Sequence, residues 1–311
     1  MDSALAVPRL LVAAFIALLT TLVFAAPVAS AAFPGRNGRI AFAESASGAE
    51  GDLVRSIGDI RPSASGLRTL RGCSQEQGLP DQGDCSIEYG APAYSPDGDR
   101  IVFDAGVRLA LMRSDGTDFS LLPRRTTDDG EPAFAPSGRR LVFTGHATPG
   151  GQADLFVQDV LSGRSRRLTS RGGSEPSWSG RNQIAFVRDG NVYVVRPSGR
   201  GLRQLTRRGG LQPDWSPHAS KLVFIRRGLL YVVRSSGRRA RRVRPRGEGR
   251  FDRDLDSPTW SPDGRYIAYY KAEDGIRRVR PDGSGYALVA ESMYGDSGSN
   301  QYSEPAWRPL R

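Results

Sequence analysis

The chain has very little cysteine, histidine and lysine, and each scarcity restricts its chemistry. Its 311 residues include two cysteines and two histidines, so a zinc site built from three or four Cys and His ligands has almost nothing to draw on. The histidines are His146 and His218, and neither has a sequence context that indicates metal binding or activation of a nucleophile. Only Lys221 and Lys271 are lysines among 44 basic residues, an arginine bias that fits a GC-rich genome.

Long hydrophobic runs are also absent, with one exception near the N-terminus. Residues Leu10–Ala26 are apolar, Arg9 precedes them, and the small residues Ala29-Ser30-Ala31 follow. This order predicts a cleaved secretory signal peptide over residues 1–31, and therefore an exported, soluble mature protein without a transmembrane segment. An uncleaved membrane anchor is the alternative, because the run approaches the ~17–25 residues that span a bilayer.

The two cysteines, Cys73 and Cys85, lie in a Gly- and Gln-rich segment. In an exported protein such a pair is expected to form a disulfide that closes the intervening loop. We predict this structural disulfide rather than a metal or redox site, which would need further ligands or a tighter Cys-x-x-Cys spacing.

What the chain does contain is a short motif, a proline, any residue and an aromatic residue, repeated six times. Successive prolines lie 37 to 47 residues apart, which is the period of a modular β architecture. All four tryptophans of the chain occupy the aromatic position of this motif. The six aromatic residues are Tyr94, Phe134, Trp178, Trp215, Trp260 and Trp307.

Five of the six motifs continue through a turn into a second apolar segment. The first copy reads Tyr94-Ser95-Pro96-Asp97-Gly98 and then Ile101-Val102-Phe103. It predicts a β-hairpin, because Pro, Asp and Gly suit the successive turn positions. Two further β-prone runs complete most units, such as Asp154–Val157 followed by Arg167–Thr169. Four short strands in every ~40–45 residues is the spacing of a propeller blade, with the large aromatic residues wedged between blades.

The two ends of the chain complement each other. The C-terminus stops after the motif of Trp307, an inner strand without a second strand, whereas Asn37–Phe42 reads as a second strand without an inner one. Pairing them would complete a blade and remove exposed sheet edges. We therefore predict an all-β, six-bladed propeller with four-stranded blades. The predicted boundaries are 32–90 with 305–311 for the composite blade, and 91–130, 131–174, 175–211, 212–256 and 257–304 for the internal blades.

The repeat has a specific resemblance to a known family. Pro-x-Trp-Ser-Pro-Asp-Gly followed by Ile-Ala-Phe, and later by Leu-Thr-x-x-Gly-Gly, resembles the WD-like propeller repeat of the TolB family. This resemblance implies a six-bladed propeller that works outside the cytoplasm as a protein-binding platform. TolB itself carries an additional α/β domain ahead of the propeller, for which this chain has no room, so its role with a lipoprotein partner does not transfer. The resemblance runs from Phe33 to Arg311, with the strongest copies at 92–103, 132–143, 176–186, 213–224 and 258–269.

Two short motifs look like catalytic or metal sites. Gly295-Asp296-Ser297-Gly298 matches the nucleophile tetrapeptide of trypsin-like proteases, but that chemistry also needs a histidine base and an oxyanion hole on another fold. We interpret it as a loop. Asp252, Asp254 and Asp256 alternate like the start of a calcium loop but lack its later Gly and Glu. A structural calcium ion is therefore an alternative to a hydrated acidic loop there, and we expect no other cofactor.

The residue before each repeat proline forms a further pattern. In a propeller this position begins the innermost strand, so the six residues are expected to ring one mouth of the central channel. An acidic ring there would suit a cation or the basic, amino-terminal end of a partner peptide. The alternative is that Glu is simply tolerated at a hydrated position before proline. The six residues are Ala91, Glu131, Glu175, Gln212, Ser257 and Glu304.

Basic residues exceed acidic ones, giving a formal net charge of +11. The densest basic run, Arg238–Arg246, is expected on an outer strand and loop of the 212–256 blade. It is either a solvated rim or a patch that binds polyanions. Aromatic residues do not alternate with these arginines, as they do in single-strand nucleic-acid binders, so we expect no nucleic-acid partner.

Together these patterns favour an exported, monomeric, noncatalytic propeller that binds another protein of the cell envelope or extracellular space through loops on a rigid scaffold. Two alternatives stay open. One is a secreted glycan hydrolase or lyase that uses carboxylates of the channel mouth as acid and base, and the other is polyanion binding through the arginine rim. Two mouth carboxylates with perturbed pKa values would favour the enzyme, whereas evenly solvated ones would favour binding.

Overall fold

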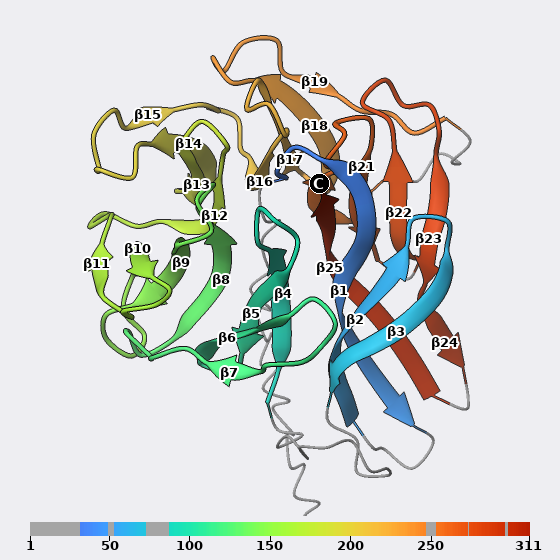
Figure 1. Cartoon of the computed structure of the whole chain (residues 1–311). Coiled ribbons are helices and arrows are strands. Elements are labelled where there is room, and N and C mark those ends of the chain that lie inside the picture. The colour runs from blue at the N-terminus through green and yellow to red at the C-terminus, as the bar shows by residue number, and fades with distance from the viewer. Residues whose placement is uncertain (1–31, 49–52, 73–86, 247–252, 273, 296–297) are drawn as a thin grey trace, which may run out of the picture.

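The computed structural model of the chain is a closed ring of six antiparallel β-sheets, which follow one another around a central axis (Figure 1). The structure describes residues 32–48, 53–72, 87–246, 253–272, 274–295 and 298–311. These residues form 25 strands and no helix, so the all-β prediction is confirmed. The described ranges accordingly contain no helix long and apolar enough to cross a membrane.

Five blades are formed by consecutive segments of the chain, and each has four strands. Blade 1 contains β4 (Tyr89–Tyr94), β5 (Arg100–Ala105), β6 (Arg108–Arg113) and β7 (Ser120–Leu121). Blade 2 contains β8 (Asp129–Phe134), β9 (Arg140–His146), β10 (Ala153–Asp159) and β11 (Ser165–Arg167). Blade 3 contains β12 (Ser174–Trp178), β13 (Ile184–Arg188), β14 (Asn191–Val195) and β15 (Arg203–Gln204). Blade 4 contains β16 (Leu211–Trp215), β17 (Lys221–Arg226), β18 (Leu229–Arg234) and β19 (Arg241–Arg242). Blade 5 contains β20 (Leu255–Trp260), β21 (Ile267–Lys271), β22 (Gly275–Val279) and β23 (Ala287–Glu291).

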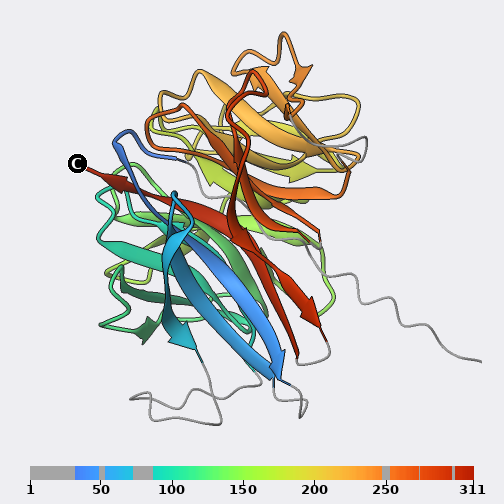
Figure 2. The same cartoon turned by 90° about the vertical axis from the view of Figure 1, so that its right-hand side faces the viewer.

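The sixth, composite blade joins the two ends of the chain. Figures 1 and 2 show the blue N-terminal strand beside the dark red C-terminal one. Trp307 lies opposite Ile40, and Ala306 lies opposite Ala41. The predicted closure of the ring is therefore confirmed, and a short β24 adds a fifth strand to this sheet. The sheet order is β24 (Met293–Gly295), β25 (Gly298–Leu310), β1 (Arg36–Gly48), β2 (Leu53–Arg61) and β3 (Ser65–Gly72).

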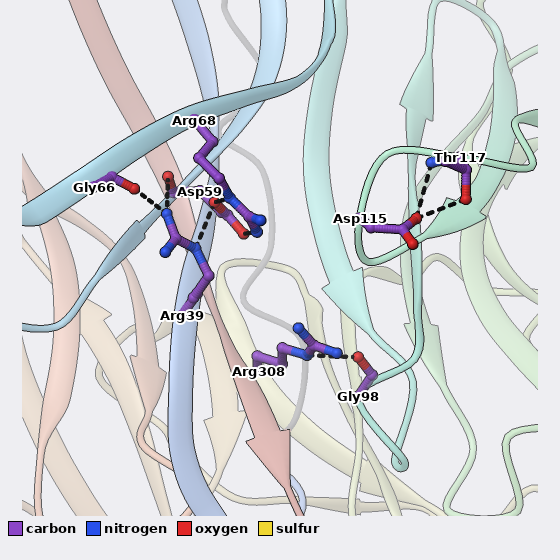
Figure 3. Close-up of polar contacts among 8 residues, drawn as sticks. All are labelled: Arg39, Asp59, Gly66, Arg68, Gly98, Asp115, Thr117 and Arg308. Atoms are coloured by element: carbon purple, nitrogen blue, oxygen red, sulfur yellow. Dashed lines mark hydrogen bonds and ion pairs between the residues drawn. The ribbon is translucent and has the colours of Figure 1, made fainter.

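Polar contacts fasten the composite blade to itself and to blade 1 (Figure 3). The fully buried Asp59 carboxylate on β2 accepts hydrogen bonds from Arg39 on β1 at 2.7 Å and from Arg68 on β3 at 2.5 Å. Arg308 on β25 donates to the carbonyl oxygen of Gly98 in blade 1 at 2.8 Å. Gly98 has a φ of 77°, and a Cβ there would lie 2.2 Å from a backbone oxygen of β25. The close approach of these two chain segments therefore requires glycine.

Six hydrophobic clusters fill the six junctions between blades, and each contains one motif aromatic. The fully buried Trp215 of blade 4, for example, packs with Ala185 and Val194 of blade 3 as well as with Phe224 of its own blade. The prediction that these aromatic residues wedge between neighbouring blades is confirmed. The core is thus distributed around the ring, and in the five internal blades it buries the aromatic residue at the end of the inner strand.

Candidate functional site

Every inner strand has a β-bulge at its motif proline. In β8, for instance, the register with β9 shifts between Gly130 and Ala133. The residue before each of the six prolines has a φ between 44° and 60°, a left-handed conformation that is costly for residues other than glycine. A feature of this kind that recurs in all six blades indicates a shared structural use for these residues.

That use is a hydrogen bond from one blade to the next. The Glu131 carboxylate accepts the backbone N–H of Glu175 at 2.8 Å. The Glu175 carboxylate in turn accepts the N–H of Gln212 at 2.5 Å, and the Gln212 side-chain oxygen accepts the N–H of Ser257 at 3.0 Å. Bulged N–H groups that leave the strand ladder thereby find acceptors in the preceding blade.

The same link joins the composite blade to blade 1. The Glu304 carboxylate accepts the backbone N–H of Ala91 in blade 1. Ala91 has no side chain that can accept the next N–H, and Asp104 at the end of β5 takes its place by accepting the N–H of Glu131 at 2.8 Å. We call these five side chains the mouth ring: Asp104, Glu131, Glu175, Gln212 and Glu304.

The structure thus places the four predicted residues, Glu131, Glu175, Gln212 and Glu304, at corresponding positions of their blades, where each side chain accepts a backbone N–H of the next blade. Their predicted role in ligand binding is a separate matter and stays a prediction. Sequence reasoning missed Asp104, because it lies on the second strand of its blade rather than at the repeated position. One signal was available in the sequence: Ala91 stands where other blades have Glu or Gln, so another side chain had to accept the N–H of Glu131.

A cavity of about 270 Å³ opens beside the mouth ring, across blades 1, 2 and 3. Its polar lining consists of four carboxyl groups, one imidazole and two hydroxyl groups, and its remaining lining residues are glycine and alanine. Small residues leave room for a side chain of a partner, and convergent carboxyl groups favour a positively charged one. The polar lining residues are Asp104, Asp128, Glu131, Thr144, His146, Ser174 and Glu175.

Burial changes the protonation of the mouth ring. It raises the pKa of Glu175 from an ordinary value of 4.5 to about 8, and the negative charge of Glu131 adds to the increase. Burial likewise raises the pKa of Glu304 to about 8, with Asp256 and Glu131 adding to it. For Asp104, burial and then the charge of Glu304 hold the pKa well above its usual range. The ring therefore carries bound protons at neutral pH.

We expect the free energy of unfolding to decrease as pH rises from about 4.5 to about 8. In this window the folded protein keeps protons on Glu175 and Glu304 that an unfolded chain releases, so rising pH favours the unfolded state. Urea denaturation at pH 5, 6.5 and 8.5 measures the slope. Glu175→Gln with Glu304→Gln should fold and make the slope shallower, because glutamine keeps an acceptor for the neighbouring N–H but cannot ionise.

The matched control for this experiment is Glu88→Gln with Glu291→Gln, two exposed side chains outside the ring. It replaces two carboxyl groups by amides, as the ring variant does, and should keep the slope of the unmodified protein. A pH dependence that is the same in the ring variant and in the unmodified protein would contradict the assignment.

A second blade-to-blade link lies at the middle position of the motif. The fully buried Asp214 carboxylate accepts the backbone N–H of Trp260 at 2.7 Å and the hydroxyl of Ser177 at 3.2 Å. The Ser177 hydroxyl oxygen also accepts the N–H of Trp215 at 3.2 Å. Burial raises the pKa of Asp214 well above its usual range. Blades 3, 4 and 5 are therefore joined twice, once through the residue before the motif proline and once through the residue after it.

The two described members of the acidic run, Asp254 and Asp256, have different surroundings. Asp254 is exposed, and its backbone oxygen accepts the N–H of Ala272. Asp256 is half-buried and accepts the N–H of Ser257 at 3.0 Å, and burial raises the pKa of Asp256. Within the described ranges, no group of three or more His, Cys, Asp or Glu side chains is arranged to hold a metal ion.

Several predicted features fall outside the described residues. These are the signal peptide over 1–31, the Cys73 and Cys85 disulfide, the first member of the acidic run, Asp252, and Asp296 and Ser297 of the protease-like tetrapeptide. The basic run Arg238–Arg246 is described, and it includes β19, the outermost strand of blade 4. His218 lies exposed on the turn between β16 and β17, whereas His146 ends β9 beside the mouth cavity.

No model of a known protein family and no curated protein matches the sequence. Solved structures match the fold across most of the chain. TolB from Acinetobacter baumannii is similar with a TM-score of 0.63 at 17% identity, over 88% of this chain and 67% of that one. In fold, the chain is a TolB-like propeller.

Solved structures of other proteins are also similar in fold to this chain. A chain of a nidogen–laminin complex has a TM-score of 0.63 at 10% identity, with 87% of this chain and 98% of that one covered. An oligogalacturonate lyase in complex with manganese has a TM-score of 0.51 at 11% identity, with 83% and 86% covered. At these identities the similarities establish the fold, and that fold supports both binding and catalysis.

Proposed function

We propose that the protein is an exported, noncatalytic binding platform of the cell envelope or extracellular space, and that its mouth cavity receives a positively charged segment of a partner protein. The observation that carries the proposal is the convergence of Asp104, Asp128, Glu131 and Glu175 on one cavity of about 270 Å³. A lysine side chain or a free amino terminus supplies the charge that this cavity lacks.

The rest of the molecule supports a binding role. The carboxyl groups come from blades 1, 2 and 3, and packed aromatic residues hold these blades together, so the site is built on a rigid scaffold. The TolB-like fold and the sequence of residues 1–31 support export. The nidogen–laminin complex is an assembly of proteins that includes a chain of this fold, which supports a protein as the ligand.

Binding of a cationic segment should release protons. The pKa of Glu175 is raised to about 8, so the site is partly protonated at neutral pH, whereas a nearby positive charge favours the ionised carboxylate. The affinity of a basic peptide should therefore increase from pH 6 to pH 8.5. An affinity that falls or stays constant over this range would place the peptide away from the mouth cavity.

The test selects peptides with free amino termini from a random library on the immobilised protein at pH 8. The selected peptides should be basic, and Glu131→Gln with Glu175→Gln should weaken their binding at least tenfold. The control pair Glu88→Gln with Glu291→Gln removes equal charge from exposed positions and should leave binding within twofold. If the peptides bind equally well to the Glu131→Gln with Glu175→Gln variant and to the unmodified protein, the proposal is overturned.

A second candidate is a glycan-active hydrolase or lyase. It is favoured by the raised pKa values of two mouth carboxyl groups, those of Glu175 and Glu304, both about 8, which is the outcome expected of an enzyme. His146 lies in the same cavity as Glu175. A protonated acid beside a potential base is an arrangement used in general acid–base catalysis. The Glu131 and Glu175 carboxylates already accept backbone N–H groups of the next blade, which supports a structural origin of the perturbed pKa and hence the binding role.

Incubation with neutral and uronic-acid polysaccharides separates the two candidates. Release of new chain ends by the unmodified protein, lost in Glu175→Gln, would establish the enzyme. Absence of any release, together with peptide binding at the mouth, would establish the binding platform.

A further inference from the structure

A second and larger cavity, of about 530 Å³, lies in the junction between blades 2 and 3, which are neighbours in Figure 1. Its lining includes the first residue of β9, a residue of β11, the turn between β12 and β13, and the turn after β14. The mouth ring lies where β8 and β12 begin, whereas this cavity lies beyond their other ends. The two cavities therefore open at opposite ends of the channel axis.

Four arginines line this cavity, and no carboxylate is among its described lining residues. We call it the arginine pocket, after Arg140, Arg166, Arg181 and Arg196. None of the four forms an ion pair within the part of the chain that the structure describes. Four like charges around one cavity repel one another, and a bound anion relieves that repulsion.

The two turns of blade 3 that line the pocket lack the acidic residues found in blades 1 and 5, as do the corresponding turns of blade 4. In blades 1 and 5 the turn after the inner strand carries Asp97 or Asp263, and the turn after the third strand carries Asp115 or Asp282. In blade 3 the corresponding turns read Ser179-Gly180-Arg181-Asn182 and Arg196-Pro197-Ser198-Gly199. Relative to blades 1 and 5, blade 3 therefore lacks a carboxylate at both turns. Arg181 stands where those blades have an aspartate, and Arg196 corresponds to an arginine that they share.

Part of the pocket is held in place before any ligand arrives. The guanidinium of Arg140 lies over the buried Trp178 ring, 5.5 Å from its centroid, and Arg166 donates to the backbone oxygen of Pro197. The indole N–H of Trp178 donates to the Asn182 side-chain oxygen at 2.9 Å, which fixes the adjoining turn. Groups ordered in advance lose less entropy on binding.

We propose that the arginine pocket binds a small multivalent oxyanion, a molecule that carries two or more phosphoryl or carboxylate groups. Its volume falls within the ~300–1,000 Å³ typical of small-molecule sites, and a single phosphate would occupy only a small part of it. Guanidinium groups bind both kinds of oxyanion through paired hydrogen bonds. Because the pocket shares no residue with the mouth ring, this activity is independent of the proposed protein-binding function.

The test titrates tripolyphosphate and citrate separately into the protein by calorimetry at fixed ionic strength. The test variant is Arg181→Gln with Arg196→Gln, two exposed side chains whose loss leaves the contacts of Trp178 in place. The control is Arg234→Gln with Arg238→Gln, two exposed arginines of blade 4 that remove equal charge. We expect saturable binding of at least one probe, weakened at least tenfold in the test variant and within twofold in the control.

Each other outcome is informative. If probe binding weakens equally in both variants, the anion responds to the net positive charge of the protein and not to this pocket. If it weakens more in the control, the site lies at the Arg238–Arg246 run. Either result, or no saturable binding at millimolar probe, would overturn the proposal. Binding of only one probe would identify the preferred oxyanion group. The mouth variant Glu131→Gln with Glu175→Gln should bind the probes unchanged, which separates this test from that of the proposed function.

Discussion

Removal of residues Pro305–Arg311 is expected to abolish the folded monomer. These seven C-terminal positions supply the part of β25 that pairs with Ile40 and Ala41 of β1. They also supply Trp307, which fills the junction between blade 5 and the composite blade together with Ile276 and Phe42. The deletion therefore removes the C-terminal part of a strand, a core residue and the contact between β25 and blade 1 at once.

The loss extends beyond one blade, because closure joins neighbours on both sides. Arg308 donates to the carbonyl oxygen of Gly98 in blade 1, and Glu304 directly precedes the deleted segment while accepting the N–H of Ala91. Without the deleted residues, the Arg36–Ala41 part of β1 becomes an open edge with unpaired N–H and C=O groups. Open edges of this kind pair with other chains, so we expect aggregated or dimeric protein.

Size-exclusion chromatography with light scattering and thermal denaturation provide the measurement. The control deletes Arg311 alone, an exposed residue beyond the end of β25, and should leave a monomer of nearly unchanged melting temperature. A stable monomer with unchanged melting after the longer deletion would show that the ring does not depend on the pairing of the chain ends.

Much of this architecture follows from the spacing of one motif. The period of the motif predicted the type of repeat and the number of its copies predicted the number of blades. The large aromatic residue in each copy had to be buried between sheets whose two faces are both covered. The incomplete motifs at Trp307 and Asn37–Phe42 predicted the closure. These inferences succeed because they depend on hydrophobic patterning and on strand pairing, which a repeat makes visible in the sequence.

The links of the mouth ring could not be predicted in the same way. A residue before proline ordinarily prefers an extended backbone, whereas all six of these residues adopt a left-handed one. The hydrogen bonds between these residues of neighbouring blades depend on that left-handed conformation. Asp104 and the arginine pocket were missed for a related reason, since their groups come from different strands and turns that only the packing of blades brings together.

Replacement of Trp215 by alanine is expected to cost about 3–5 kcal/mol of the free energy of unfolding. The ring is fully buried and packs against Ala185, Val192 and Val194 of the preceding blade, so the substitution leaves a cavity across a blade junction. Urea denaturation of the unmodified protein and the variant, monitored by circular dichroism, measures the loss.

Trp215→Phe is the conservative counterpart of this substitution. Within the described structure the Trp215 indole N–H has no hydrogen-bond partner, so a phenyl ring sacrifices volume but no hydrogen bond, and Phe134 fills the same position of blade 2. It should cost much less than alanine. Leu161→Ala, at a side chain that is 87% exposed, should change stability by no more than about 0.5 kcal/mol. A loss below roughly 1 kcal/mol for Trp215→Ala, the size of a surface effect, would mean that the motif aromatics do not hold neighbouring blades together.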